Sequence, residues 1–213
     1  DECIYFQTSG LSLKLKPVLE ASTAWTRFQA SGPAKPDVGS EIAARVEKSR
    51  AAVADALGAD ADEIMLQENT TVGINVVAAG IDWHAGDEVI LSNHEHPGNR
   101  IPWYNVANLY GVTLRYLDFG LDDARLLAQL EELLSDRTRV VAVSHVSRRT
   151  GRRIPAAALV DAAHRRNVPV LLDGAQAFGA VPVDLHEIGC DYYAFSGHKY
   201  IMAPQGTGGC FVR

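Results

Sequence analysis

Residues 168–176 read VPVLLDGAQ, and this stretch decides the predicted fold. The run up to Leu172 is apolar without alternation, which is typical of a strand buried on both faces of a parallel sheet. It ends abruptly at Asp173, a carboxylate followed by a glycine. A strand that is buried along its length and charged at its end indicates a sheet whose edge carries a binding site.

Five more short apolar runs occur along the chain, and helical patterns such as residues 124–134 and 155–166 separate several of them. Strands that alternate with helices predict βαβ units. We therefore expect an α/β fold, a three-layer α/β/α arrangement with a mostly parallel sheet. The runs are EIML (63–66), EVIL (88–91), VTLRYL (112–117), RVVAV (139–143) and YYAF (192–195).

The chain divides into two parts by its pattern. Residues 1–40 are rich in proline and glycine and predict an N-terminal arm that extends over the domain. Residues 41–213 are periodic and predict one large domain. Its first helix is expected to start at a capping Ser40 and to stop at Gly58.

Composition excludes several classes of protein. The 213 residues carry a net charge of −6, which argues against a nucleic-acid partner. The apolar runs are too short for a membrane span, so no membrane association is expected. The cysteines Cys3, Cys190 and Cys210 lack the spacing of metal ligands, so no metal site is predicted. A reduced, cytoplasmic protein is the expectation.

Polar clusters follow five of the predicted strands. Because parallel strands bring their carboxyl ends to one edge, these clusters should meet there. The clusters are ENTT (68–71), SNHEHPGN (92–99), SHVSRRTG (144–151), DGAQ (173–176) and SGHK (196–199).

The lysine of the last cluster points to a particular cofactor chemistry. Lys199, at the end of a buried strand, is suited to form a Schiff base with an aldehyde cofactor. Pyridoxal 5′-phosphate (PLP) also needs an acid against its pyridine nitrogen, and Asp173 is the carboxylate in place. Gln176, three residues later, is within reach of the ring hydroxyl.

The remaining clusters supply the other contacts that this cofactor needs. Thr70 and Thr71 open a helix after a strand, which is a position for phosphate. Ser196 and His198 add donors, and His96 is expected to cover the ring. The other histidines are expected on loops or helix surfaces; they are His84, His94, His145, His164 and His186.

In their order along the chain, these motifs resemble the class V aminotransferase-fold PLP enzymes of fold type I. That family includes cysteine desulfurases, cyst(e)ine C–S lyases and isopenicillin N epimerase-like proteins. The resemblance covers essentially the whole chain. Its motifs are IYFQTSG, NTTVGIN, GIDWHAGDEVIL, EHPGN, SHVSRRTGRRIP, DGAQAFGAVPVDL, DYYAFSGHKY and GTGG.

The resemblance implies a role for each matching residue. Lys199 would hold the cofactor and move the proton of the substrate α-carbon, and Asp173 would pair with the ring nitrogen. Gln176 would bind the phenolic oxygen, and His96 would stack on the ring. Phosphate would be held by four residues: Thr70, Thr71, Ser196 and His198. The substrate would be an L-amino acid, the reaction C–S cleavage of cysteine or cystine, and the assembly a homodimer.

Two departures from the family bear on substrate and domain content. Where relatives commonly carry an asparagine after SHVS, this chain has Arg148 and Arg149, which are candidate substrate-binding residues and favour a more acidic substrate. Relatives also continue after the lysine into a smaller domain. We therefore expect the small domain to be missing from this chain, and a second chain is a candidate partner to carry it.

Three alternatives remain open from the residues alone. The same site supports epimerase-like racemisation or transamination. A non-catalytic relative would bind PLP only as a scaffold. A nucleotide-binding α/β protein is disfavoured, because ENTTVG lacks the glycine spacing of such a loop.

Overall fold

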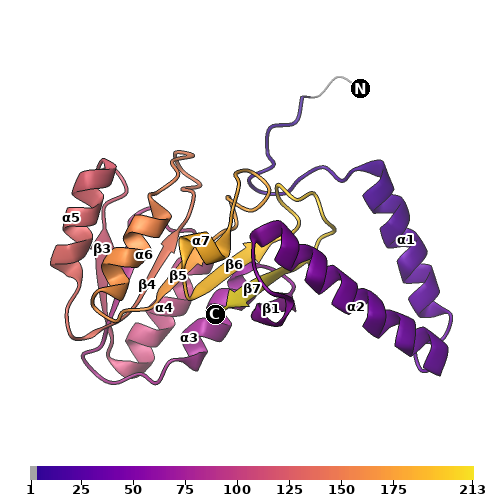
Figure 1. The fold of residues 1–213 in the computed structure, drawn as a ribbon, viewed down its shortest axis with the longest axis horizontal. Helices are drawn as coiled ribbons and strands as arrows, with labels where there is room; N and C mark the ends of the chain where they lie inside the picture. The colour runs from indigo at the N-terminus through magenta and orange to yellow at the C-terminus, as the bar shows by residue number, and fades with distance from the viewer. Residues whose placement is uncertain (1–3) are drawn as a thin grey trace.

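The six apolar runs form six strands of one seven-stranded sheet in the computed structural model, which describes residues 4–213 (Figure 1); residues 208–212 form the seventh strand. The spatial order is β1-β7-β6-β5-β4-β2-β3. All strands run in one direction except β7, which is antiparallel to both neighbours. The strands are β1 (Ile64–Gln67), β2 (Glu88–Ser92), β3 (Thr113–Leu117), β4 (Thr138–Ser144), β5 (Val170–Asp173), β6 (Tyr192–Ser196) and β7 (Gly208–Val212).

Helices cover both faces of the sheet, as the uninterrupted apolar strands require. Along β4, Val140 and Ala142 pack in one apolar cluster, whereas Val141 and Val143 pack in the other. The first cluster contains residues of α3 (Thr70–Gly80) and α4 (Pro97–Tyr110). The second contains residues of α5 (Asp123–Leu133), α6 (Ala156–His164), α7 (Leu185–Ile188) and the end of α2 (Pro36–Leu57). The predicted three-layer fold is confirmed.

The N-terminal region differs from the expected arm. Residues Lys16–Ala30 form helix α1, which has no buried residue and lies away from the sheet (Figure 1). Helix α2 begins at Pro36, not at Ser40, because proline at the first helical position already has the helical φ angle. The Ser40 hydroxyl instead donates to Pro36 O at 2.8 Å. The expected boundary after residue 40 therefore falls inside α2, which does end at Gly58 (φ 60°).

Residues before α1 do extend over the domain, at the carboxyl edge of the sheet. Ser12 N and Ser12 Oγ both donate to His198 O, at 3.0 and 2.9 Å. Lys14 Nζ donates to the same carbonyl at 3.2 Å. The arm thus closes over the turn that carries Lys199.

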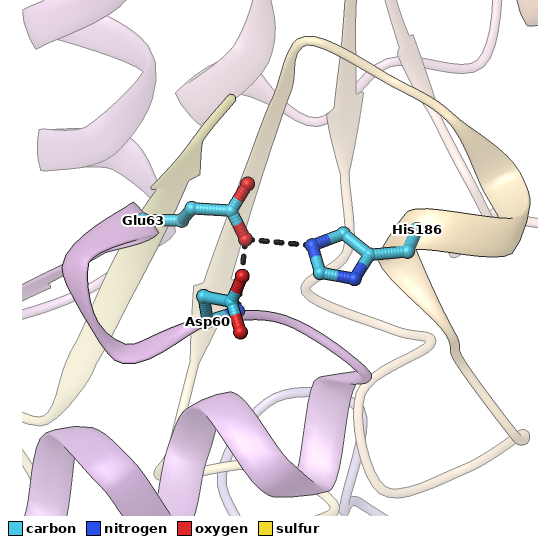
Figure 2. Close-up of side chains that lie close together, drawn as sticks. All are labelled: Asp60, Glu63 and His186. Atoms are coloured by element: carbon cyan, nitrogen blue, oxygen red, sulfur yellow. Dashed lines mark hydrogen bonds and ion pairs between the residues drawn. The ribbon is translucent and has the colours of Figure 1, made fainter.

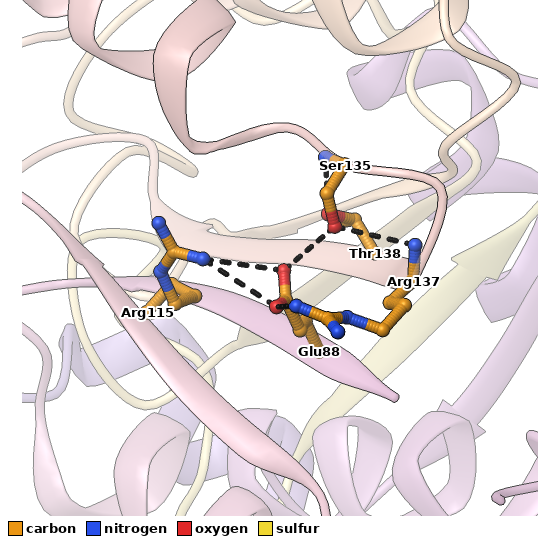
Figure 3. A network of polar contacts seen from close by, with 5 residues as sticks. All are labelled: Glu88, Arg115, Ser135, Arg137 and Thr138. Atoms are coloured by element: carbon orange, nitrogen blue, oxygen red, sulfur yellow. Dashed lines mark hydrogen bonds and ion pairs between the residues drawn. The ribbon is translucent and has the colours of Figure 1, made fainter. Parts of the chain in front are cut away.

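A buried carboxylate organises the opposite, amino edge of the sheet (Figure 3). Glu88, at the start of β2, accepts from Ser135 Oγ at 2.8 Å and from Arg137 at 3.0 Å. Arg115 of β3 lies 3.4 Å from the same side chain. Burial alone would raise the pKa of Glu88, but these hydrogen bonds and charges bring it below its ordinary value. The network ties β2, β3 and the segment before β4 together.

A smaller polar cluster joins the turn η1 (Ala61–Glu63) to α7 (Figure 2). Glu63 Oε2 accepts from Asp60 N and from His186 Nε2, both at 2.8 Å. Potential metal-ligand atoms of these three residues lie within 4.8 Å of one another. The contacts are those of a capping box and an ion pair, and they account for the cluster structurally.

Within residues 4–213, every helix is too short or too polar to cross a bilayer.

Candidate active site

One cavity of about 800 Å³ lies at the carboxyl edge of the sheet. This volume suits a ligand of cofactor size. All ten residues singled out from the sequence line it: Thr70, Thr71, His96, Arg148, Arg149, Asp173, Gln176, Ser196, His198 and Lys199. The convergence follows from topology, since β1, β2, β4, β5 and β6 run in the same direction and end at this edge. The role of each residue stays a prediction.

Lys199 lies in the turn directly after β6. Ala203 N donates to Gly197 O and Met202 N to Lys199 O, both at 2.9 Å, so the turn is closed by its own backbone. Burial lowers the pKa of Lys199; Asp173 opposes this shift and Arg148 adds to it. A lysine whose pKa is lowered is more often neutral and therefore more nucleophilic.

Asp173 ends β5 and lines the same cavity as Lys199. Its side chain is buried, and Oδ1 accepts from Ala175 N at 2.9 Å. Burial raises the pKa of Asp173, against the opposing effects of that hydrogen bond and of Lys199. Within residues 4–213 no cationic group lies in ion-pair distance of it. Such a carboxylate is suited to a cationic ring nitrogen.

The N-terminus of α3 forms the polar floor of the cavity. Asn69 caps the helix by accepting from Val72 N at 3.1 Å. Ser196 Oγ accepts from Thr70 N at 3.0 Å and lies 2.7 Å from Thr70 Oγ1. The end of β6 is thereby joined to the start of α3, and their hydroxyls are gathered at a helix N-terminus, where an anion is favoured.

His198 adds an unused polar atom to this floor. Its Nδ1 is buried and has no hydrogen-bond partner within the described chain. Burial lowers the pKa of His198, and the charges of Lys199 and Lys14 lower it further. A buried ring nitrogen without a partner can donate to a phosphate oxygen when it carries the ring proton.

Of the two histidines in the loop after β2, the structure turns His96 toward the cavity. Its Nδ1 accepts from Gly98 N at 2.9 Å, which caps α4. A Cβ on Gly98 would lie 2.4 Å from Thr71 Oγ1, so only glycine allows this approach of the loop to α3. His94 points elsewhere, with Nδ1 3.1 Å from Ser147 Oγ and its ring edge against Phe119. The preference for His96 over His94 is consistent with this geometry.

Gln176 and the two arginines also line the cavity, Gln176 as a buried residue. Gln176 Nε2 donates to Ser9 O at 3.0 Å, and the amide keeps a second N–H. Arg148 and Arg149 are exposed, and neither forms an ion pair within the described residues. The charge of Arg148 lowers the pKa of both His96 and Lys199, whereas that of Arg149 lowers the pKa of His94.

Several residues at this edge were missed by the sequence reasoning. Gln7, Ser9 and Gly10 line the cavity because the arm crosses it, and no local signal predicts where an arm lies. His145, expected on a surface, is fully buried: Nδ1 lies 3.1 Å from Tyr193 Oη, and burial lowers its pKa to about 4. The expectation was wrong because His145 follows β4 in a segment still covered by the second apolar cluster.

The most consequential missed residue is Glu95. It is 6% exposed and carries a carboxylate into the interior between the ends of β2 and β4. Burial and the charge of Asp173 raise its pKa to about 7, although bonds from Ser92 and Ser144 oppose the shift. In the sequence, Glu95 stands in the polar run SNHEHPGN, where a glutamate reads as solvated.

Comparisons with known proteins agree on one family. A sequence profile described as aminotransferase class-V matches residues 4–213. A cysteine desulfurase of Enterobacter sp. (strain 638) is 34% identical over 98% of this chain and 53% of its own length. The chain spans about half the length of the curated relatives it matches.

Two solved structures of C-DES have the same fold over this chain. One is a complex between the cystine C–S lyase C-DES and its reaction product cysteine persulfide (TM-score 0.93, 33% identity, 98% of this chain and 57% of that one). The other is a lysine-to-alanine variant with glycine covalently linked to the PLP cofactor (TM-score 0.93, 33% identity, 98% and 56%).

Proposed function

The chain belongs to the class V aminotransferase family, and from that membership we propose that it forms the cofactor-binding part of a PLP-dependent enzyme that cleaves the C–S bond of cysteine or cystine. The observation that carries the proposal is that Lys199 and Asp173 line one cavity, together with a polar floor at the N-terminus of α3.

The residues present fit PLP. The buried free Nδ1 of His198 and the hydroxyls of Thr70, Thr71 and Ser196 suit a phosphate group. The buried Asp173, without a cationic partner in the described chain, suits a protonated pyridine nitrogen. When bound, PLP supplies a carbonyl carbon that takes an amine covalently and a ring that accepts electrons from the substrate α-carbon.

Four residues of the chain would then have separate roles in the reaction. Asp173 holds the proton at the ring nitrogen, because its buried carboxylate is stabilised by a cation beside it. Lys199 would hold the cofactor and take the proton from the substrate α-carbon, for which its lowered pKa suits it. His96 excludes water from one side of the cavity, and the exposed Arg148, which also lines it, binds the substrate carboxylate.

The substrate assignment comes from the relatives. C-DES is described as a cystine C–S lyase with cysteine persulfide as product, and several curated relatives are cysteine desulfurases. We extend that substrate class to this chain.

We also propose that two copies associate. Helix α4 and the neighbouring β3 expose large apolar side chains: Ile101, Leu109, Tyr110 and Tyr116. A surface of this kind is typical of protein–protein contact. Sedimentation velocity checks the assembly, and a concentration-independent monomer would contradict it.

Absorption spectroscopy with borohydride reduction tests the cofactor assignment. The full-length protein that carries this chain, incubated with PLP, should develop a visible band. Borohydride should then attach the cofactor permanently to the peptide that contains Lys199, as read by mass spectrometry. Sulfide release from cysteine and cystine tests the reaction. A reduced adduct on Lys199 without sulfide release would support the cofactor assignment and refute the proposed substrate class.

A further inference from the structure

We propose that Glu95 is a positioning residue: its buried carboxylate anchors the loop between β2 and α4 to the end of β4, and this anchor sets the position of the His96 ring in the cavity. The proposal rests on the proposed function, in which His96 lies against the bound PLP.

The contacts of Glu95 are unusually complete. Oε1 accepts from the Ser92 hydroxyl and, at 2.9 Å, from Ser144 N. Oε2 accepts from Ser144 Oγ and from Asn99 Nδ2, both at 2.7 Å. A carboxylate is an acceptor only, and here each oxygen has two donors. One side chain therefore joins the end of β2, the end of β4 and the first turn of α4.

The anchor continues into the apolar core through Asn99. Its Nδ2 also donates to Ala142 O of β4 at 3.4 Å, and its Oδ1 accepts from Trp103 Nε1 at 3.0 Å. Trp103 is fully buried and packs edge-on against Trp83. The first turn of α4 is thereby held to the sheet by side chains that cannot shift without disturbing the core.

His96 lies between the two held residues. Glu95 precedes it directly, and Asn99 N donates to His96 O at 2.8 Å. With the backbone held on both sides, the imidazole keeps only its own side-chain rotations, and the bond from Gly98 N to Nδ1 restricts these. A ring held this way is placed before the ligand arrives, which reduces the entropy lost on binding.

An uncharged polar side chain at position 95 could also hydrogen-bond to the loop, and its burial would cost less free energy than that of a carboxylate. Burial and the nearby Asp173 both penalise the charged form of Glu95, and no cation within the described residues pairs with it. The feature that a carboxylate alone offers is acceptance of four donors at one point. Holding four donors at one point fixes the position of the loop as well as stabilising it, and the fixed residue is the neighbour of His96.

The test compares Glu95→Gln with His96→Ala, the double variant, and Glu88→Gln as the matched control. Glu88 is an equally buried glutamate at the far edge of the sheet. In the full chain, PLP affinity is measured by absorbance titration, and the orientation of the bound cofactor by its visible circular dichroism. We expect Glu95→Gln to weaken PLP binding about tenfold and to reduce the dichroic band. The glutamine NH₂ is a donor and cannot accept the hydrogen bonds that one carboxylate oxygen accepts.

His96→Ala should produce the same two changes, and the double variant should add little to either, since both act through one ring. Glu88→Gln should leave both readouts at the wild-type level whatever it does to stability. Additive losses in the double variant, or unchanged dichroism in Glu95→Gln, would overturn the proposal. Ser144→Ala keeps the carboxylate and removes one donor, so it should give a smaller loss even if Glu95→Gln folds poorly.

Nuclear magnetic resonance of the His96 ring, recorded without cofactor, separates this proposal from the proposed function. The His96 signals should shift in Glu95→Gln and stay in place in Glu88→Gln. If wild-type protein bound no PLP while these shifts occurred, the proposed function would fail and the anchor would stand. Unmoved His96 signals would refute the anchor itself.

Discussion

The two edges of the sheet use buried carboxylates in opposite ways. At the amino edge, Glu88 receives bonds from Ser135 and Arg137 and the charge of Arg115, and its pKa is lowered. At the carboxyl edge, Asp173 and Glu95 are as buried but have no arginine within ion-pair distance in the described residues, and their pKa values are raised.

The difference separates a structural charge from a functional one. The neutralised Glu88 stabilises the packing of three chain segments and leaves nothing for a ligand. Glu95 is satisfied by hydrogen bonds alone, whereas the charged form of Asp173 would be stabilised by a cation beside it, which is the arrangement expected of a binding site. Four predictions test this contrast, from the largest expected effect to the smallest.

Replacing Lys199 by alanine should reduce turnover of cysteine or cystine by at least about 10³-fold, because the proton carrier and covalent attachment point are both lost. The free energy of unfolding should stay constant or rise, since a partly buried amine is removed. Sulfide release and urea unfolding measure the two quantities. If the variant kept its turnover but unfolded more easily, Lys199 would have a structural role and not a catalytic one.

The pH dependence of stability should follow Glu95. Its pKa in the folded chain is about 7, above the ordinary value of 4.5. Between these values the folded chain keeps a proton that the unfolded chain has released, so the free energy of unfolding falls as pH rises. The fall amounts to roughly 3 kcal/mol at most and is complete above pH 7.

Urea unfolding from pH 5 to pH 8 tests this prediction against Glu95→Gln, which cannot ionise. The variant's curve should lose stability less steeply over this range. Parallel curves for wild type and variant would show that Glu95 is not the titrating group.

Replacing Glu88 by alanine should cost about 2 kcal/mol of unfolding free energy, since Arg115 and Arg137 lose their shared partner. The cost is modest for a buried ion pair because both arginines are partly in water, with exposed side-chain fractions of 37% and 68%. PLP affinity should be unchanged. If the variant bound PLP more weakly than wild type at equal stability, Glu88 would also serve the cofactor, and the contrast between the two edges would be wrong.

Replacing Ser196 by alanine should cost about 1 kcal/mol of stability, because Thr70 N loses its acceptor at the start of α3. Phosphate or PLP affinity should fall several-fold with it. Thr26→Ala offers a control, since its hydroxyl bonds within α1, away from the cavity. Isothermal titration calorimetry measures the affinity. Equal affinities of the two variants would show that Ser196 does not bind the phosphate group.

Much of this molecule follows from local sequence patterns. Apolar runs such as residues 139–143 and 168–172 predict buried strands, because a strand covered on both faces needs no polar alternation. The position of Lys199 and Asp173 at strand ends is equally local. Since parallel strands share an edge, the convergence of the ten predicted residues at one cavity could be expected without knowing the strand order.

Other features depend on contacts between distant segments, and only the tertiary structure decided them. Thr70 and Ser196 lie 126 positions apart and meet because β1 and β6 flank β7. The helix α1, the burial of His145 and the four donors around Glu95 likewise have no local signal. Hydrophobic periodicity records which face of an element is buried, whereas the burial of a polar side chain depends on which partners the fold brings to it.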